Sequence, residues 1–321
     1  MRDRSLLPPH PSELYSLKPT NVAGLAFVAG SMVLTALGLW LASSTVPALW
    51  ISGQIVLAFA FVQWFILLHE CGHGTLFHSR RLHILAGHLA GFFAIIPFHC
   101  WKQIHYRHHK WTGWQDVDPT TTTLRPRALG RVERLLVNIC WRYWVPLFSV
   151  LYRLNNFWNM PRLMRLYESQ PRPQRRLVMN AAALAMIYVT LISMIGPVTL
   201  LRLAGPALVL ALVAEDVLLL SQHTHVPMNL SHGRNVDPYR AVAQEEFTRS
   251  LRLPSWLSRL WLHFDAHELH HMYPFVPGYR LAQIPYVPAN EVSWRRWIPA
   301  ARALPGEVFL FQNRNQSGFD V

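Results

Sequence analysis

The sequence has 321 residues, of which 51% are hydrophobic and only 15% are Asp, Glu, Lys or Arg, and its mean hydropathy is +0.16. This balance favours a polytopic membrane protein over a soluble domain. The formal net charge of +13 fits either nucleic acid or anionic lipid headgroups as a partner. Because the basic residues flank apolar runs, we interpret them as topology determinants and expect no nucleic-acid partner. The three cysteines form no CxxC pair and imply no disulfide framework.

Four apolar runs are long enough to cross a bilayer as helices, at residues 21–44, 48–68, 178–201 and 203–220. The sequence therefore predicts an all-α integral membrane fold with four transmembrane helices in two hairpins, the second pair being separated only by Arg202 and its neighbours. Two weaker runs, 84–98 and 136–152, contain a histidine or an arginine and a proline. We expect them to lie along the membrane, since a charge at the bilayer centre costs about 2.5 to 3.5 kcal/mol.

Basic residues set the expected orientation. The first run has no small-residue cleavage site after it and is predicted to be a retained helix, not a signal peptide. Arginine and lysine concentrate between the two hairpins and in the C-terminal hundred residues, so both termini and the intervening segment are expected in the cytoplasm, in a bacterial inner membrane. The basic residues between the hairpins include Arg80, Arg81, Arg107, Lys110, Arg125, Arg127, Arg131, Arg134, Arg172, Arg175 and Arg176.

These features predict one membrane domain over 1–321, made of five segments. The segments are a cytoplasmic tail at 1–20, a first hairpin at 21–68, a cytoplasmic or interfacial segment at 69–177, a second hairpin at 178–220 and a cytoplasmic C-terminal segment at 221–321. The two cytoplasmic segments together should form a helical cap that carries a metal site.

Histidine clusters identify that site. Residues three or four apart on a helix project from one face, so each cluster presents its imidazoles together. A lone histidine is more often structural, but clusters with helical ligand spacing favour metal binding. The clustered histidines are His69 and His73, then His105, His108 and His109, then His267, His270 and His271. His223 and His225 follow the last apolar run and cannot share a helix face, so one of them is expected to be a ninth ligand; we favour His223.

The number of histidines narrows the choice of metal. Imidazole ligands suit iron, zinc, copper or nickel. Four-coordinate zinc needs three or four protein ligands, whereas two iron ions of five or six coordination would use all nine histidines and leave room for oxygen. Asp216 lies two helical turns before His223 and is a candidate hydrogen-bond partner of a ligand, as are Glu70, Glu268 and His225. We interpret Asp116 and Asp118 as a polar turn before Pro119, with orientation of the second cluster as the alternative.

The same motifs resemble those of the membrane-bound fatty acid desaturases. The motifs are HECGH at 69–73, WKQIHYRHHKWTG at 101–113, QHTH at 222–225, HELHHMYP at 267–274 and YRL at 279–281. The chain looks closest to the acyl-lipid branch of delta-12 and omega-3 type, which acts toward the methyl end of the chain. The resemblance implies a di-iron (Fe2+/Fe3+) centre on the cytoplasmic side of four membrane helices, O2 as co-substrate, a long-chain fatty acyl or related lipid substrate, and electrons from ferredoxin or cytochrome b5.

By this resemblance the ligand roles fall to His69, His73, His105, His108, His109, His223, His267, His270 and His271. The chain has no His-Pro-Gly-Gly run of a fused cytochrome b5 and no cysteine set for an iron–sulfur cluster, so the electron donor should be a separate protein.

Three alternatives remain at this stage. Membrane hydroxylases and ketolases acting on a hydrocarbon, sphingolipid or carotenoid share the same pattern of histidine clusters. The HExxH pattern at His69 and again at His267 also matches zinc proteases, in which Glu70 would be a general base. A metal transporter or haem-binding protein is the third, although its ligands should lie within the spans rather than beyond their ends.

Overall fold

The computed structural model describes residues 7–319 and 321; Arg2 and Arg4, two basic residues before the first apolar run, lie outside them. The chain is mostly helical, as predicted, and its described residues form one short parallel strand pair, β1 (Leu251–Arg252) with β2 (Val292–Ser293). It divides into two compact units. We call Pro19–Ile104 with Phe148–Glu215 the apolar unit, and Met1–Lys18, His105–Leu147 and Asp216–Val321 the histidine unit.

Four helices are long and apolar enough to cross a membrane: α1 (Asn21–Ala42), α2 (Pro47–His73), α8 (Pro171–Ile195) and α9 (Pro197–His223). They match the four predicted runs. The number of spans rises to as many as six if two bent helix pairs each count as one span. These pairs are α3 (Arg80–Ala94) with α4 (Phe98–Trp111), and α5 (Arg131–Arg142) with α6 (Leu147–Arg153) and the π-helical turn Leu154–Trp158.

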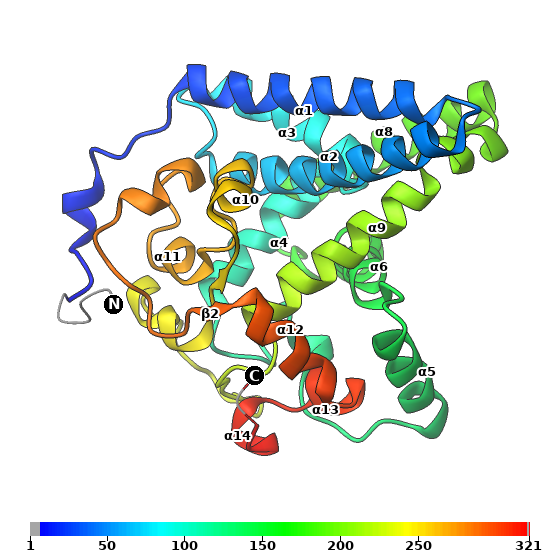
Figure 1. The fold of residues 1–321 in the computed structure, drawn as a ribbon. Helices are drawn as coiled ribbons and strands as arrows, with labels where there is room; N and C mark the ends of the chain where they lie inside the picture. The colour runs from blue at the N-terminus through cyan, green and yellow to red at the C-terminus, as the bar shows by residue number, and fades with distance from the viewer. Residues whose placement is uncertain (1–6, 320) are drawn as a thin grey trace. The chain divides into compact units, whose positions relative to one another are not determined.

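Within the apolar unit, α1 and α2 run side by side (Figure 1). Small residues permit this close packing. A Cβ atom added at Gly53 would lie 2.4 Å from the Ala42 backbone nitrogen, and one at Gly38 would lie 2.7 Å from the Leu57 side chain. The indole of Trp64 donates a buried hydrogen bond of 2.9 Å to the hydroxyl of Thr35. The two helices are therefore fixed by backbone approach and by one polar contact.

A proline inside α9 explains a second polar contact of this unit. Pro206 has no N–H, so it cannot donate to the carbonyl of Arg202 one turn earlier. The Trp50 indole nitrogen donates to that carbonyl at 3.1 Å, and the Gln54 amide donates to the neighbouring Leu203 carbonyl at 2.9 Å. These α2 side chains therefore satisfy carbonyl groups that a regular helix would have bonded internally.

A buried ion pair also lies in this unit. The Arg153 guanidinium contacts the Glu215 carboxylate, and both side chains are almost fully buried. The Arg153 Nε atom also donates to the Ala94 carbonyl at 3.2 Å. Glu215, an acid inside an apolar run, is therefore the partner of a buried cation.

The predicted boundaries of the apolar runs need three corrections. The second pair is separated at Gly196, not at Arg202, because Gly196 adopts a φ of 87° and Pro197 then starts α9. The helices α2 and α9 extend beyond the apolar runs to His73 and His223, so both ends carry histidine. The run at 84–98 is not one helix, because Ile95 takes a φ of 57° and ends α3.

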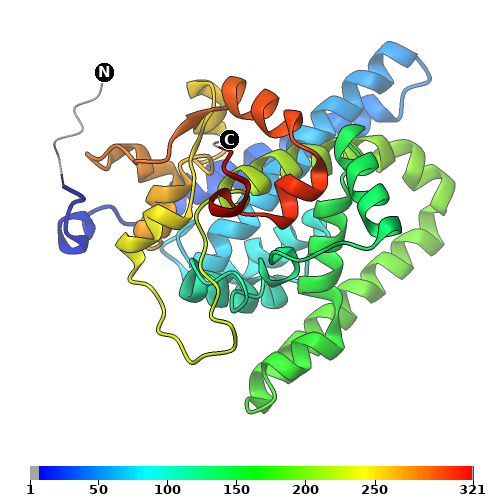
Figure 2. The same cartoon turned by 90° about the horizontal axis from the view of Figure 1, so that it is seen from below.

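Short elements build the histidine unit. A loop without regular helix connects α9 to the 3-10 helix η4 (Figure 2). Leu269 and Met272 of α11 pack with Tyr273 and Val276 in a hydrophobic cluster, which leaves the histidines on the rest of that helix. The elements not yet bounded are η1 (Pro11–Leu14), η2 (Thr122–Leu124), α7 (Met160–Leu166, in the apolar unit), η4 (Ala241–Phe247), α10 (Ser255–Leu260), α11 (His267–Met272), η5 (Gly278–Gln283), α12 (Trp294–Ala303), α13 (Gly306–Phe311) and α14 (Arg314–Ser317).

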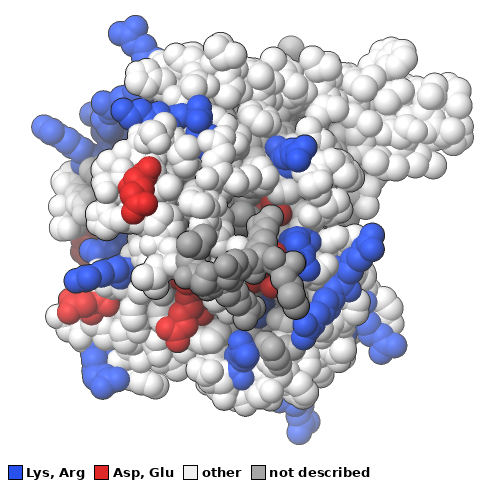
Figure 3. All heavy atoms as spheres, turned by 60° about the vertical axis from the view of Figure 1, so that its left-hand side comes forward, with Lys and Arg blue, Asp and Glu red and all other residues white. Residues whose placement is uncertain are grey.

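Charged side chains on the face drawn in Figure 3 are mostly Lys and Arg, in keeping with the formal net charge of +13. An arginine connects two helices of the histidine unit. The Arg134 guanidinium of α5 lies 2.7 Å from the Glu307 carboxylate of α13. Since the Arg134 side chain is more than half exposed, this pair contributes at most about 1 kcal/mol.

Candidate metal centre

Four imidazoles of the histidine unit converge on one point. They come from α4, the end of α9 and α11, and are His108, His223, His267 and His271. One ring nitrogen of each lies within 4.8 Å of the other three. The His223 Nε2 atom lies 2.7 Å from the His267 Nε2 atom and 3.0 Å from the His108 Nε2 atom. We call these residues the four-histidine group.

The hydrogen-bond partners around this group point its nitrogen lone pairs inward. The His108 Nδ1 atom lies 2.7 Å from the Asp118 carboxylate, which can only accept when ionised, so Nδ1 carries the proton and Nε2 carries the lone pair. Burial, followed by the neighbouring imidazoles, holds the pKa of His271 well below its usual range. Neutral imidazole is the form that binds metals.

The residues present fit a cation. Lone pairs that face one another at 2.7 to 3.0 Å repel unless a proton or a metal ion lies between them. The buried Nε2 atom of His271 has no hydrogen-bond partner among the described residues. All four donors are imidazole nitrogens, a set that suits iron, zinc, copper or nickel.

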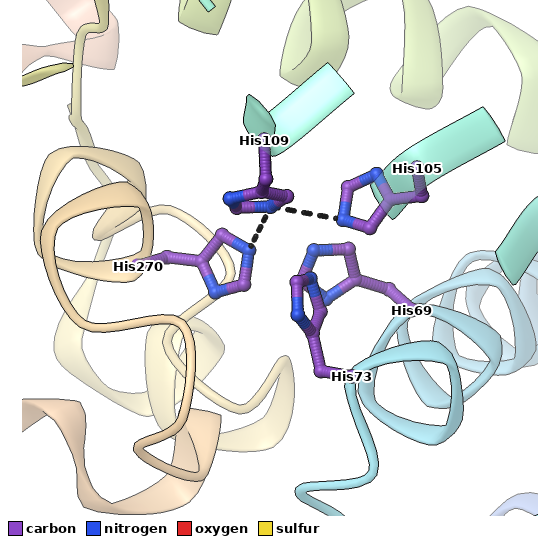
Figure 4. A group of neighbouring side chains, drawn as sticks. All are labelled: His69, His73, His105, His109 and His270. Atoms are coloured by element: carbon purple, nitrogen blue, oxygen red, sulfur yellow. Dashed lines mark hydrogen bonds between the residues drawn. The ribbon is translucent and has the colours of Figure 1, made fainter. Parts of the chain in front are cut away.

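A second group in the same unit contains His105, His109 and His270. The His109 Nε2 atom lies 3.1 Å from the His105 Nε2 atom and 3.0 Å from the His270 Nε2 atom, as the dashed lines in Figure 4 show. His105 and His109 are one helical turn apart on α4, which explains why they share a face. We call these residues the three-histidine group.

His69 and His73 lie in the apolar unit, on the last turns of α2 (Figure 4). Their ring centroids are 4.8 Å apart, and they share a helix face as the spacing predicts. The helix ends directly after them because Gly74 takes a left-handed φ of 77°. Cys71, between them, is fully buried.

His225 has other partners. Its Nε2 atom lies 2.6 Å from the Ser317 hydroxyl, and its Nδ1 atom lies 3.2 Å from the Gln312 carbonyl. Both ring nitrogens are therefore used to bind the C-terminal segment of the histidine unit. The geometry thus supports His223 over His225 as a ligand.

The two glutamates of the HExxH patterns also have defined partners. The Glu268 carboxylate accepts backbone N–H groups from Asn290 at 2.7 Å and from Ser250 at 3.0 Å, one on each oxygen. Burial raises the pKa of Glu268 to about 8, while these hydrogen bonds act in the opposite direction. The Glu70 carboxylate accepts from the Thr75 hydroxyl at 2.8 Å and lies 3.3 Å from the His69 Nδ1 atom. Both carboxylates therefore accept hydrogen bonds that hold neighbouring segments of the chain beside the histidines.

The sequence reasoning undervalued one aspartate. Asp118 does form the predicted turn, since it accepts from the Thr120 backbone at 2.8 Å, but its other oxygen holds His108. The view of Asp118 as a turn residue alone is therefore wrong. Asp116 instead binds the loop at Ser231, accepting from the backbone at 2.8 Å and from the hydroxyl at 2.9 Å. Asp216 is half-buried on α9.

Gln244 was missed entirely. It lies on η4, about twenty residues from the nearest clustered histidine on either side, and its side chain contacts His271. A single glutamine in a polar segment carries no spacing signal, so only the folded arrangement identifies it.

Comparison with known proteins gives a consistent result. A family model described as fatty acid desaturase matches residues 44–290. The sn-1 oleoyl-lipid 12-desaturase of a Picosynechococcus species is 26% identical over 301 residues, which is 88% of this chain and 80% of that protein.

Two Arabidopsis thaliana proteins are each 25% identical over 68% of this chain. One is a temperature-sensitive sn-2 acyl-lipid omega-3 desaturase (ferredoxin) of the chloroplast, of which the match covers 52%. The other is an acyl-lipid omega-3 desaturase (cytochrome b5) of the endoplasmic reticulum, of which it covers 58%. The chain thus spans little more than half the length of these plant relatives. Because the family model covers most of the sequence, the chain belongs to the fatty acid desaturase family and is an oxidoreductase of the desaturase type.

Proposed function

We propose that the chain is an oxygen-dependent di-iron enzyme that desaturates a long-chain fatty acyl or related lipid chain. The observation that carries this proposal is the four-histidine group, in which one ring nitrogen of each of four imidazoles lies within 4.8 Å of the other three. His108, His223, His267 and His271 would hold one iron ion. The three-histidine group would hold the second, and by the resemblance His69 and His73 also take ligand roles.

The bound irons would supply an oxidant, made from O2 and electrons, that can remove hydrogen from an unactivated methylene group. The side chains of this protein would bind the irons and orient the ligand rings. Asp118 holds the ring of His108, and the burial of the ligands keeps water away from the site. A general base is not required, because methylene hydrogens are not acidic.

We extend the proposal to topology and partners. Two helical hairpins would place both termini and the histidine clusters on the cytoplasmic side of a bacterial inner membrane, because the basic residues gather in those segments. Electrons would come from a separate protein of ferredoxin or cytochrome b5 type, the two donors after which the Arabidopsis relatives are named. The weak apolar runs would lie along the membrane surface.

Lipid analysis of a bacterial host tests the proposal. The host should express the chain together with a ferredoxin and its reductase, beside a matched strain that carries His108→Ala. We expect a new double bond in membrane acyl chains of the first strain alone, and only under oxygen. Hydroxylated or keto products would instead support a hydroxylase or ketolase, and unchanged lipids in both strains across a range of acyl chain lengths would contradict the acyl substrate.

A further inference from the structure

Gln244 joins the two histidine groups. Its side chain is 2% exposed and lies on η4, which packs against α11. The Gln244 Oε1 atom lies 2.9 Å from the His271 Nδ1 atom, and the Gln244 Nε2 atom donates to the His109 carbonyl at 2.7 Å. One amide thus contacts a ring of the four-histidine group and the backbone of a residue of the three-histidine group.

The chemistry of these contacts fixes where the protons are. A backbone carbonyl can only accept a hydrogen bond, so the amide NH2 of Gln244 must face His109. The amide oxygen then faces His271 and can only accept, so the His271 Nδ1 atom must carry the hydrogen. The lone pair of His271 is therefore on Nε2, the buried atom that has no partner among the described residues.

Gln244 is itself held firmly. Its backbone carbonyl accepts from the Thr248 hydroxyl at 2.9 Å. The next residue, Glu245, accepts from the Tyr286 hydroxyl at 2.8 Å and from the Ala289 backbone at 2.9 Å, and its carbonyl accepts from the Asn290 amide at 2.8 Å. Asn290 also donates to Glu268 on α11. The amide is thus anchored to the helix whose histidine it orients.

We propose that Gln244 is a positioning residue that selects the Nε2-ligating tautomer of His271. The inference rests on the proposed function, because it assumes that both groups bind metal. Asp118 orients the ring of His108 in the same way, but through a charged carboxylate. Gln244 does so without charge, and its amide also donates to the backbone of His109 in the three-histidine group.

Cobalt binding by the purified full-length protein tests the inference without measuring turnover. Metal-free wild type, Gln244→Ala, Gln244→Glu and Gln283→Ala are titrated with Co2+ under anaerobic conditions. The readouts are ions bound per chain, affinity by chelator competition, and the visible absorption of bound Co2+. Gln283, an exposed glutamine of the 3-10 helix η5, is the matched control.

We expect two ions in wild type and in Gln283→Ala. In Gln244→Ala one of the two ions should bind about 10-fold to 100-fold more weakly, as for other residues that orient metal ligands. Gln244→Glu keeps the acceptor for His271 but loses the donor to His109. It should therefore recover most of the affinity, with a shifted absorption band, because a carboxylate makes the imidazole a stronger ligand.

The outcomes separate the inference from the proposed function. Two ions bound with wild-type affinity in Gln244→Ala would overturn the inference alone, whereas a wild type that binds no metal would overturn the proposed function. If the role of Gln244 is purely structural, Gln244→Ala and Gln244→Glu should both have a lower melting temperature without metal and should bind Co2+ with the same affinity. That result would also overturn the inference. If Gln244→Ala does not fold, Gln244→Met fills the space without donor or acceptor and carries the same expectation.

Discussion

The imidazole of His108 is hydrogen-bonded to the carboxylate of Asp118, with 2.7 Å between Nδ1 and Oδ2. Asp118 is fully buried, and its second oxygen accepts from the Thr120 hydroxyl at 2.9 Å. A carboxylate in this place raises the basicity of the ligand and fixes the ring orientation. Ten residues separate the two in sequence, and the turn after Gly113 returns the chain to the helix end.

Asp118→Asn should therefore weaken iron binding about 10-fold to 100-fold, since an amide holds the ring less strongly than a carboxylate. The variant should still fold, because asparagine can accept the Thr120 backbone hydrogen bond. Asp116→Asn is the control, as Asp116 binds the Ser231 loop and no imidazole. Iron affinity and content of both purified variants check this. Equal iron affinity in Asp118→Asn and wild type would refute the role of Asp118.

Removing a ligand should have a larger effect than removing its partner. We expect the purified protein to bind about two irons and His108→Ala to lose metal and activity together, because a cation under-coordinated in a buried pocket is strongly destabilised. His225→Ala should keep its iron, since both of its ring nitrogens bind the C-terminal segment. Full iron content and turnover in His108→Ala would contradict the assignment.

The clustering of the histidines was predictable because helical spacing shows itself in the sequence, whereas Gln244 was missed and Asp118 was undervalued. His105 and His109 are one turn apart, and that fact alone places them on one face. Gln244 and Asp118 reach the imidazoles through loops whose path depends on tertiary packing. Apolar runs likewise predicted four helices, but not that α2 continues to His73, because a helix end is set by a residue such as Gly74 with a positive φ.

The buried pair of Arg153 with Glu215 gives a stability prediction. Glu215→Leu leaves the guanidinium without its counter-charge and should cost about 3 to 5 kcal/mol of unfolding free energy. The double variant Arg153→Met with Glu215→Leu should recover most of that loss, since well-packed apolar residues replace buried ion pairs at little cost. Denaturant unfolding in detergent measures both. Additive losses in the double variant would show that the pair is not coupled.

The expected topology can be tested apart from the chemistry. With an even number of spans and arginine-rich flanks, we expect both termini in the cytoplasm. A reporter that is active only in the cytoplasm should therefore be active when it is fused after Val321. The same reporter inserted at residue 196, between α8 and α9, should be inactive. A periplasmic signal from the Val321 fusion would remove the shared cytoplasmic site from the model.

Glu70 separates the desaturase from a zinc hydrolase. In a hydrolase Glu70 would be the general base, and Glu70→Gln would abolish all activity while metal stays bound. In the structure its oxygens contact the Thr75 hydroxyl and His69, so the change should only perturb ligand orientation and lower activity about 10-fold to 100-fold. We therefore expect Glu70→Gln to keep its iron and to retain measurable lipid oxidation that requires oxygen and reductant. Oxygen-independent peptide cleavage by the wild type, lost in this variant, would instead establish the hydrolase.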